Sequence, residues 1–241
     1  MGFVVDIMGL SVNVMTDKEL YSLSGLYLGN DATNIMYMFS VDTLKKVSGN
    51  EELLAIMNEA DVCLPAERTI LNKQNRQMRI GMVKSYRNFF NMLKIAGLVR
   101  NVYLVGKNER IMESMTEVLL SYNPVLDICG RYSFSDEMSD ESIVNDINSK
   151  APNVLLLALD TPDVQKWIAN NRHLINTKLC VCLCDISETI IKENVEPPRL
   201  IHILRLGKLY NSIIRRKYTE SKKKERIFQA MLAEYNDKKE E

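Results

Sequence analysis

Residues 153–168, NVLLLALDTPDVQKWI, constrain the fold more than any other stretch of the sequence. The apolar run from Val154 to Leu159 reads as a buried strand, and the turn Asp160-Thr161-Pro162 leads into an amphipathic helix. In open α/β sheets, ligands bind at the carboxyl ends of such strands, where a helix N-terminus faces the ligand. The stretch therefore predicts an α/β fold with a binding site beside Asp160.

The same alternation of apolar and helical segments runs from Val4 to Glu193. Several strand candidates are continuously apolar, as expected when helices cover both faces of a parallel sheet. We therefore expect an α/β, doubly wound fold with a mostly parallel sheet and helices on both faces. The expected strands are Val4–Met8, Asn34–Phe39, Asp61–Leu64, Val102–Val105, Leu126–Cys129, Val154–Leu159 and Leu179–Cys184; the expected helices are Asp17–Tyr27, Val41–Val47, Glu51–Asn58, Val83–Ala96, Glu109–Tyr122, Ser139–Lys150, Pro162–Asn171 and Ser187–Glu193.

The pattern changes at Pro197-Pro198, so we divide the chain into an α/β domain, residues 1–196, and a basic amphipathic helical appendage, residues 197–241. The segment Arg199–Lys217 mixes apolar and basic residues, and Lys222–Tyr235 reads as a last helix. Nine Lys or Arg stand against two Glu between residues 205 and 226. A neutral body therefore carries a basic tail.

Composition excludes several classes of protein. The 31 basic and 31 acidic residues balance, which argues against a general nucleic-acid binder. The start MGFVVDIMG lacks the charged segment of a signal peptide, and no apolar run approaches the roughly 20 residues that span a bilayer. Two interpretations of the tail stay open: a solvated charged helix, or contact with anionic lipid at the inner face of the cell membrane. The second would use Arg205, Lys208, Arg215, Arg216 and Lys217.

Cysteines and histidines do not form a recognisable catalytic or metal-binding pattern. Cys180, Cys182 and Cys184 alternate along one expected strand, so they should face one side as buried free thiols. Reduced thiols indicate the cytosol. His173 and His202 have no spaced Cys, Asp or Glu partner. We expect neither a metal site nor a cofactor.

The turns at the strand ends are poor in glycine. Gly106 in YLVGKNER is the best phosphate-type turn, although a simple strand-end turn is the favoured explanation of a single glycine. The turn at Asp160 has no glycine, and its acidic residues Asp160 and Asp163 would face a bound phosphate. Trp167, in the helix that follows, is expected to lie in the core.

At this point the order of segments resembles one known family. The segments are VDIMGLSVNVMTDKEL, ADVCLPAERTIL, VRNVYLVGKNERIMESMTEVLLSYNPVLDICG, APNVLLLALDTPDVQKWI and LIHILRLGKLYNSIIRRKY. They are similar to successive motifs of the WecG/TagA/CpsF family, glycosyltransferase family 26, over almost the whole chain. The resemblance implies an enzyme that moves a sugar from a UDP-sugar to an undecaprenyl-linked acceptor during cell-envelope polysaccharide or teichoic-acid synthesis.

The sequence departs from this family at chemical positions. The family's "PDG" carboxylate, its general base, falls on Ala66, and the following glycine falls on Glu67. The "GlG-x-PkQE" turn becomes residues 158–165 without either glycine or the lysine, and the arginine of "RAP" falls on Glu196. Gly106, Asp160, Thr161 and Gln165 would be the remnant of the nucleotide-sugar cleft.

These replacements suggest a lost activity. A diphosphate is held by backbone amides and cations, which side-chain bulk and acidic residues oppose, so we expect this cleft to reject it. Our first hypothesis is a non-catalytic cytoplasmic protein, peripheral at the inner membrane face, in a homo- or hetero-oligomer with an active paralogue. The alternative is a divergent transferase that uses Glu67 and Arg205 on a UDP-sugar and a lipid-linked acceptor. A third possibility is a sensor of a non-phosphorylated small molecule on the same fold.

Overall fold

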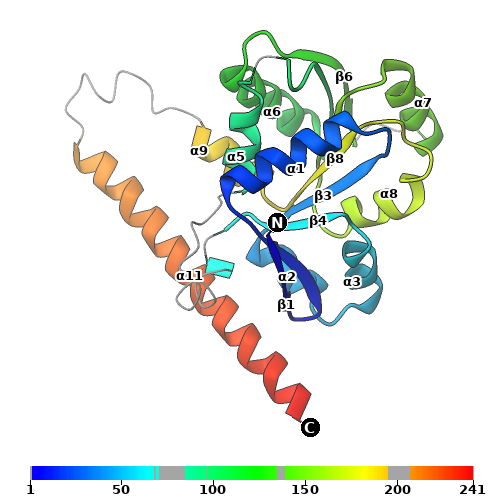
Figure 1. Cartoon of the computed structure of the whole chain (residues 1–241). Coiled ribbons are helices and arrows are strands. Elements are labelled where there is room, and N and C mark those ends of the chain that lie inside the picture. The colour runs from blue at the N-terminus through cyan, green and yellow to red at the C-terminus, as the bar shows by residue number, and fades with distance from the viewer. Residues whose placement is uncertain are drawn as a thin grey trace.

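The computed structural model describes residues 2–67, 69–70, 85–95, 97–134, 139–194 and 207–240; in the last helix, side chains are described from residue 220 to residue 239. Its main sheet has six parallel strands in the order β4-β3-β8-β7-β5-β6 (Figure 1). These strands are β3 (Asn34–Phe39), β4 (Val62–Pro65), β5 (Asn101–Gly106), β6 (Asp127–Ser133), β7 (Val154–Ala158) and β8 (Leu179–Cys184).

Helices cover both faces of this sheet, which confirms the expected doubly wound α/β fold. Every residue of β3, β7 and β8 is buried, because side chains on both sides of each strand contact a helical layer. One face packs against α1 (Asp17–Gly29), α5 (Ser85–Met92), α6 (Glu109–Tyr122) and α9 (Ser187–Asn194). The other packs against α2 (Val41–Val47), α3 (Glu51–Asn58), α7 (Asp140–Lys150) and α8 (Asp163–Asn171).

The first strand does not join the main sheet. The expected strand at Val4–Met8 forms as β1 (Phe3–Ile7), but it pairs antiparallel with β2 (Leu10–Val14), where we expected no element. Met8 and Gly9 both have positive φ, 55° and 85°, as a tight two-residue hairpin turn requires. The alternation in LSVNV, which buries Leu10, Val12 and Val14, is the signal that the sequence analysis missed.

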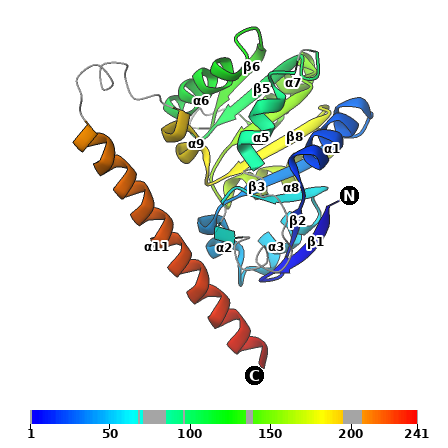
Figure 2. The same ribbon diagram turned by 60° about the vertical axis from the view of Figure 1, so that its left-hand side comes forward.

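Within the described part of the appendage, residues 207–240 form one continuous helix, α11 (Gly207–Glu240), and not a separate last helix beginning at Lys222. After Gly207 the segment contains neither glycine nor proline, so nothing in it ends the helix early. The N-terminal end of α11 stands away from the α/β body in both views (Figures 1 and 2). Its later part contacts the body: Phe228 is 1% exposed and belongs to the same core cluster as α2, α3, α7 and α8.

The order of the strands creates a crevice at the carboxyl ends of β5 and β7. These strands are neighbours, but the chain leaves β5 toward β6 and leaves β7 toward β8, on opposite sides. The helices that follow them, α6 and α8, accordingly lie on opposite faces of the sheet. Such a switch point is where ligands bind in open α/β sheets.

Candidate functional site

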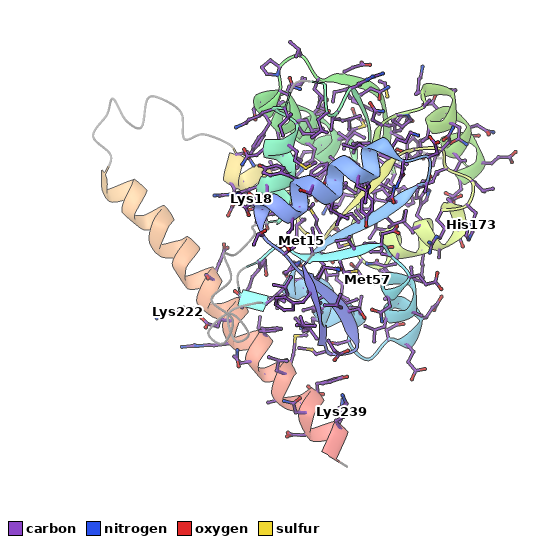
Figure 3. The ribbon with its side chains drawn as sticks, in the orientation of Figure 1. Met15, Lys18, Met57, His173, Lys222 and Lys239 are labelled. Carbon is purple, nitrogen blue, oxygen red and sulfur yellow. The ribbon has the colours of Figure 1, made fainter. Side chains whose placement is uncertain are left out.

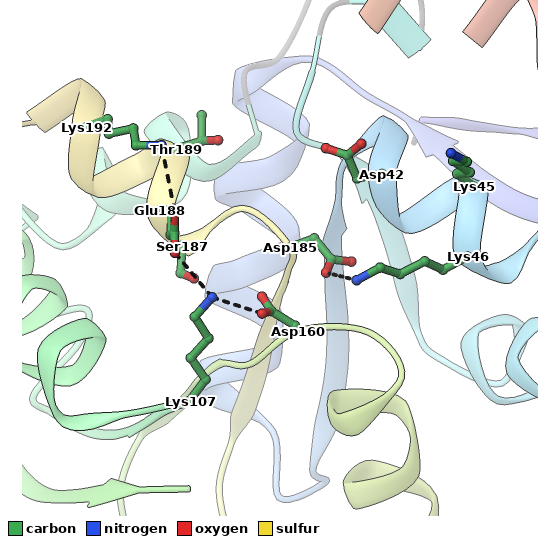
Figure 4. Close-up of a pocket in the computed structure, with 10 residues that line it drawn as sticks. All are labelled: Asp42, Lys45, Lys46, Lys107, Asp160, Asp185, Ser187, Glu188, Thr189 and Lys192. Atoms are coloured by element: carbon green, nitrogen blue, oxygen red, sulfur yellow. Dashed lines mark hydrogen bonds and ion pairs between the residues drawn. The ribbon is translucent and has the colours of Figure 1, made fainter. Parts of the chain in front are cut away.

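A pocket of about 660 Å³ lies at these carboxyl ends. Its walls are α2, the first residues after β5, β7 and β8, and the first turns of α9 (Figure 4). This is the edge of the sheet where the sequence analysis placed a site. The lining residues are Asp42, Lys45, Lys46, Lys107, Asp160, Asp185, Ser187, Glu188, Thr189 and Lys192.

Asp185 joins three of these walls. It directly follows β8 and has a φ of 57°. Its Oδ2 accepts from Thr43 at 2.9 Å, and its Oδ1 accepts from the Thr161 amide at 3.2 Å and from Lys46 at 2.6 Å. Because its carboxylate is largely buried and tied to α2 and to the turn after β7, Asp185 acts as a structural anchor of the pocket floor.

The acidic residues of the pocket are compensated by lysines. Lys107 follows β5 and pairs with Asp160, which follows β7, at 2.9 Å across the crevice. Burial opposes the charge of Lys107, but hydrogen bonds and attraction from Asp160 and Glu188 outweigh it and raise its pKa. Four lysines face four acidic residues in the lining. The acidic residues expected at this cleft are present but are paired with cations, and Asp163, expected beside Asp160, does not line the pocket.

Three cations converge on Glu188 in the first turn of α9. Lys107 and Arg110 reach its Oε1 at 3.3 and 3.2 Å, and Lys192 reaches its Oε2 at 3.7 Å. The hydrogen bond from Lys107 is the largest cause of the lowered pKa of Glu188. Ser187 is 1% exposed, and its hydroxyl has no hydrogen-bond partner among the described residues. One helix N-terminus thus combines cations, an acid and an unsatisfied hydroxyl.

Glu67, the candidate general base, is contacted by two groups. Its Oε2 accepts from the amide of Val41 at 3.1 Å, and its Oε1 pairs with Lys224 of α11. Lys224 also lies 3.6 Å from Asp42, which faces the pocket. Burial disfavours the charge of Lys224, but the carboxylates of Glu67 and Asp42 outweigh that effect and raise its pKa. Ala66 itself is 4% exposed.

Of the four residues proposed for the nucleotide-sugar cleft, Asp160 lines the pocket. Gly106 ends β5, and a Cβ there would lie 3.0 Å from the Cβ of Met112 in α6, so its missing side chain allows close packing of the helix. The Thr161 carbonyl accepts from Lys46 at 3.0 Å. Gln165 is fully buried; its Nε2 lies 3.3 Å from Thr161 Oγ1, and its Oε1 has no partner among the described residues.

The expected cysteine arrangement is confirmed. Cys180, Cys182 and Cys184 belong to one core cluster, and burial raises the pKa of Cys182 and Cys184. Trp167 is core as expected. His173 is exposed on the side of the body away from α11 (Figure 3), and His202 lies outside the described residues. Within the described ranges no group of three or more His, Cys, Asp or Glu is placed to hold a metal ion.

The proposed membrane contacts fall largely outside what the structure describes. Arg205 is outside the described residues, as are Glu196 and the boundary at Pro197-Pro198. Lys208, Arg215, Arg216 and Lys217 belong to α11, but their side chains are also outside the described part. In that part, no helix is both long and apolar enough to cross a bilayer.

The sequence analysis did not identify most of the cations that line the pocket, and it also missed Asp185. Lys107 and Asp185 are the first residues after β5 and β8, a position that already suggested Asp160 after β7. A consistent search for charged residues at every strand end would have found both. Lys46 and Glu188 lie within helices that follow strands, and the pairing of their charges becomes visible only when the strand order is known.

The fold and the pocket together define a class: a doubly wound α/β protein with a charged ligand pocket at its switch point. A glycosyl transferase family model, WecG/TagA/CpsF, matches residues 5–217, and the chain belongs to this family. The curated relatives include N-acetylglucosaminyldiphosphoundecaprenol N-acetyl-beta-D-mannosaminyltransferase of Staphylococcus aureus (strain MRSA252). It is 18% identical over 215 residues, which cover 87% of this chain and 84% of the relative. The family consists of glycosyltransferases of cell-envelope polysaccharide synthesis.

Proposed function

We propose that this chain is a non-catalytic member of its family that acts as a partner of an active enzyme in cell-envelope polysaccharide synthesis. The contacts of the Glu67 carboxylate are the main support for this proposal. Ala66 stands where the family resemblance puts the general base, and the neighbouring carboxylate of Glu67 is bound by the α2 N-terminus and by Lys224. Loss of a general base commonly lowers a rate by about 10² to 10⁴.

The pocket supports the same proposal. Lys46, Lys107 and Lys192 are already paired with the chain's own carboxylates, so a diphosphate has to compete for them. The glycines that would let backbone amides approach a phosphate are replaced at Ala158 and Asp160. Weak ligand binding and no turnover are the expected properties.

A turnover assay tests the loss of activity. The full chain is incubated with UDP-N-acetylmannosamine and N-acetylglucosaminyl-diphospho-undecaprenol, the substrates that the name of the Staphylococcus relative suggests, and UDP release is measured. We expect no release above the protein-free blank, with the relative as the positive control. Turnover by the wild-type chain that disappears in Glu67→Gln would overturn the proposal.

The partner role is tested by measuring the molar mass of the complex in solution. Light scattering after size exclusion would be measured for the chain alone, for an active family member of the same cell, and for their mixture. We expect the mixture to contain a species with the summed mass of both proteins. Elution of the two proteins independently at micromolar concentration would contradict a stable partnership.

We also propose that α11 brings the protein to the inner face of the cell membrane. Its N-terminal end stands away from the body, and the sequence there places Arg215, Arg216 and Lys217 in succession. Vesicles with anionic lipid should bind the wild type more than Arg215→Gln/Arg216→Gln/Lys217→Gln, and salt should reduce the difference. Neutralising Lys222, Lys223 and Arg226 provides a control with the same charge change. Equal pelleting of all three proteins would argue for a solvated helix.

One observation favours the alternative, a divergent active transferase. Asp42 lines the pocket, and its side chain is 51% exposed, so an acid does face the ligand space. If the chain is active, Asp42→Asn should abolish UDP release without changing the thermal midpoint. The turnover assay therefore decides between the two functions.

A further inference from the structure

The last part of α11 has an outer face that the α/β body does not cover. The body contacts the side of the helix that carries Phe228. Arg226, Ala230, Ala233 and Asp237 lie on the opposite side of the helix, and all four are exposed. In both views the last turns of α11 extend past the body, so this outer face is open to another molecule (Figures 1 and 2).

The spacing along the outer face is that of a helix that packs against another helix. Residues 223, 226, 230, 233 and 237 follow one another at alternating intervals of three and four, like the a and d positions of a heptad repeat. α11 has 34 residues, which is about 50 Å at 1.5 Å per residue. Helices of this length are typical of coiled coils or membrane spans, and over its described residues α11 is not apolar enough to cross a bilayer.

The charges on the outer face complement each other when two copies lie antiparallel. Arg226 lies about one turn before Ala230, and Asp237 lies about one turn after Ala233. If Ala230 of each copy opposes Ala233 of the other, Arg226 of each copy therefore faces Asp237 of the other. A parallel pair would instead place like charges together. Among the described residues, neither Arg226 nor Asp237 forms an ion pair within the chain.

We propose that two copies of this chain associate through the outer faces of α11, as an antiparallel pair of helices. Ala230 packs against Ala233 of the other copy, and Arg226 pairs with Asp237 of the other copy; the two-fold axis repeats each contact. The small central side chains let the helices approach to the short end of the usual 8–10 Å range. Exposed ion pairs contribute little to affinity, so the association is weak and the charges mainly fix its orientation.

The interface lies in a segment beyond the family match, which ends at residue 217. It is therefore a feature of the extension of this chain, and it does not depend on whether the chain is catalytic. Each α/β body contacts its own helix on the side away from the pair, so the bodies stand on the outside of the dimer.

Sedimentation equilibrium of the full chain, over a concentration series from micromolar to near millimolar, tests the pair. We expect the wild type to pass from monomer to dimer. Arg226→Asp places like charges together at two symmetric contacts, and so does Asp237→Arg; each should raise the dimer Kd about tenfold or more. Lys18→Asp is the matched control, because it makes the same charge change as Arg226→Asp on the exposed surface of α1 (Figure 3) and should leave the Kd unchanged.

A mixture of the two single variants tests the orientation. When Arg226→Asp meets Asp237→Arg in an antiparallel pair, opposite charges face each other again at both contacts. The mixture should therefore form a heterodimer with a Kd close to that of the wild type. The double variant Arg226→Asp/Asp237→Arg should recover self-association for the same reason. Such recovery also shows that the single variants are folded.

The outcomes that overturn this proposal are distinct from those that concern the proposed function. A wild type that stays monomeric over the whole series overturns the pair, even if the outer face of α11 binds an active family member instead. A dimer that Arg226→Asp weakens no more than Lys18→Asp also overturns it. A mixture that associates no more tightly than the single variants overturns the antiparallel arrangement. The UDP-release assay tests the non-catalytic proposal, whatever the result of sedimentation.

Discussion

Phe228→Ala should release α11 from the body while the sheet stays folded. Phe228 is 1% exposed in the core cluster, and Ile227, Met231, Leu232 and Tyr235 pack against the same cluster only partly buried. Truncating a buried Phe to Ala costs about 3–5 kcal/mol. Each 1.4 kcal/mol is about a factor of ten in an equilibrium, so the undocked helix should be populated about a hundredfold more or higher.

Hydrogen exchange measured by mass spectrometry is the assay. Peptides from residues 220–239 should exchange about a hundredfold faster or more in Phe228→Ala, while β7 and β8 keep their protection. Phe90→Ala is the matched control, because Phe90 is 0% exposed in the cluster on the opposite face of the sheet. It should lower protection in the sheet and not selectively in α11. Unchanged exchange of residues 220–239 in Phe228→Ala would refute the reasoning, and so would equal losses in α11 and in the sheet.

Three further predictions concern stability, measured as urea midpoints. Gly130→Ala should lower the free energy of unfolding by about 1–3 kcal/mol, because the new Cβ would lie 2.2 Å from the ring of Tyr103. A Cβ at Gly25 has nothing within 4 Å, so Gly25→Ala should leave the stability unchanged or raise it. Equal effects of the two substitutions would contradict this reasoning. Asp185→Asn should cost about 1–3 kcal/mol by breaking its lysine pair, and an unchanged midpoint would show that it is not an anchor. The hydrogen bond and the attraction from Lys107 lower the pKa of Glu188 from 4.5. The stability of the wild type relative to Glu188→Gln should therefore be present above pH 4.5 and be lost as the pH falls through the lowered pKa. A stability difference that persists at lower pH would contradict this assignment.

The main sheet could be predicted because its strands are buried on both sides. The run Leu179–Cys184 is apolar throughout and Asn34–Phe39 is apolar after its first residue, so periodicity and length define both strands, and both have the expected bounds. The hairpin was missed for the opposite reason. Its strands alternate, and the turn at Met8-Gly9 lacks the Asn or Asp that usually marks such a turn.

The charge of the pocket could not be predicted from local sequence. Asp160 was visible as an acid at a strand end, but its partner Lys107 lies more than fifty residues earlier in the chain, after a strand whose neighbour is set by topology. A linear sequence shows the number of acids and lysines, and not which of them face each other. The location of the pocket was predictable, since parallel strands present their carboxyl ends at one edge.

The docking of α11 on the body could not be predicted from the sequence either. Glu67 was considered for catalysis because of its position beside Ala66, whereas its contact with Lys224 depends on how a distant helix crosses the body. The family match ends at residue 217, so the described contacts of α11 come from a segment beyond it. Family resemblance alone therefore did not indicate this contact.

The attachment of α11 has a consequence for biosynthesis. The ribosome synthesises the α/β body before residues 220–239, at about 5–20 residues per second. During that interval the surface that later receives Phe228 is bare and apolar, and a nascent chain with such a patch attracts chaperones or other chains. Docking of the helix thus covers the apolar surface that would otherwise promote aggregation of the newly made protein.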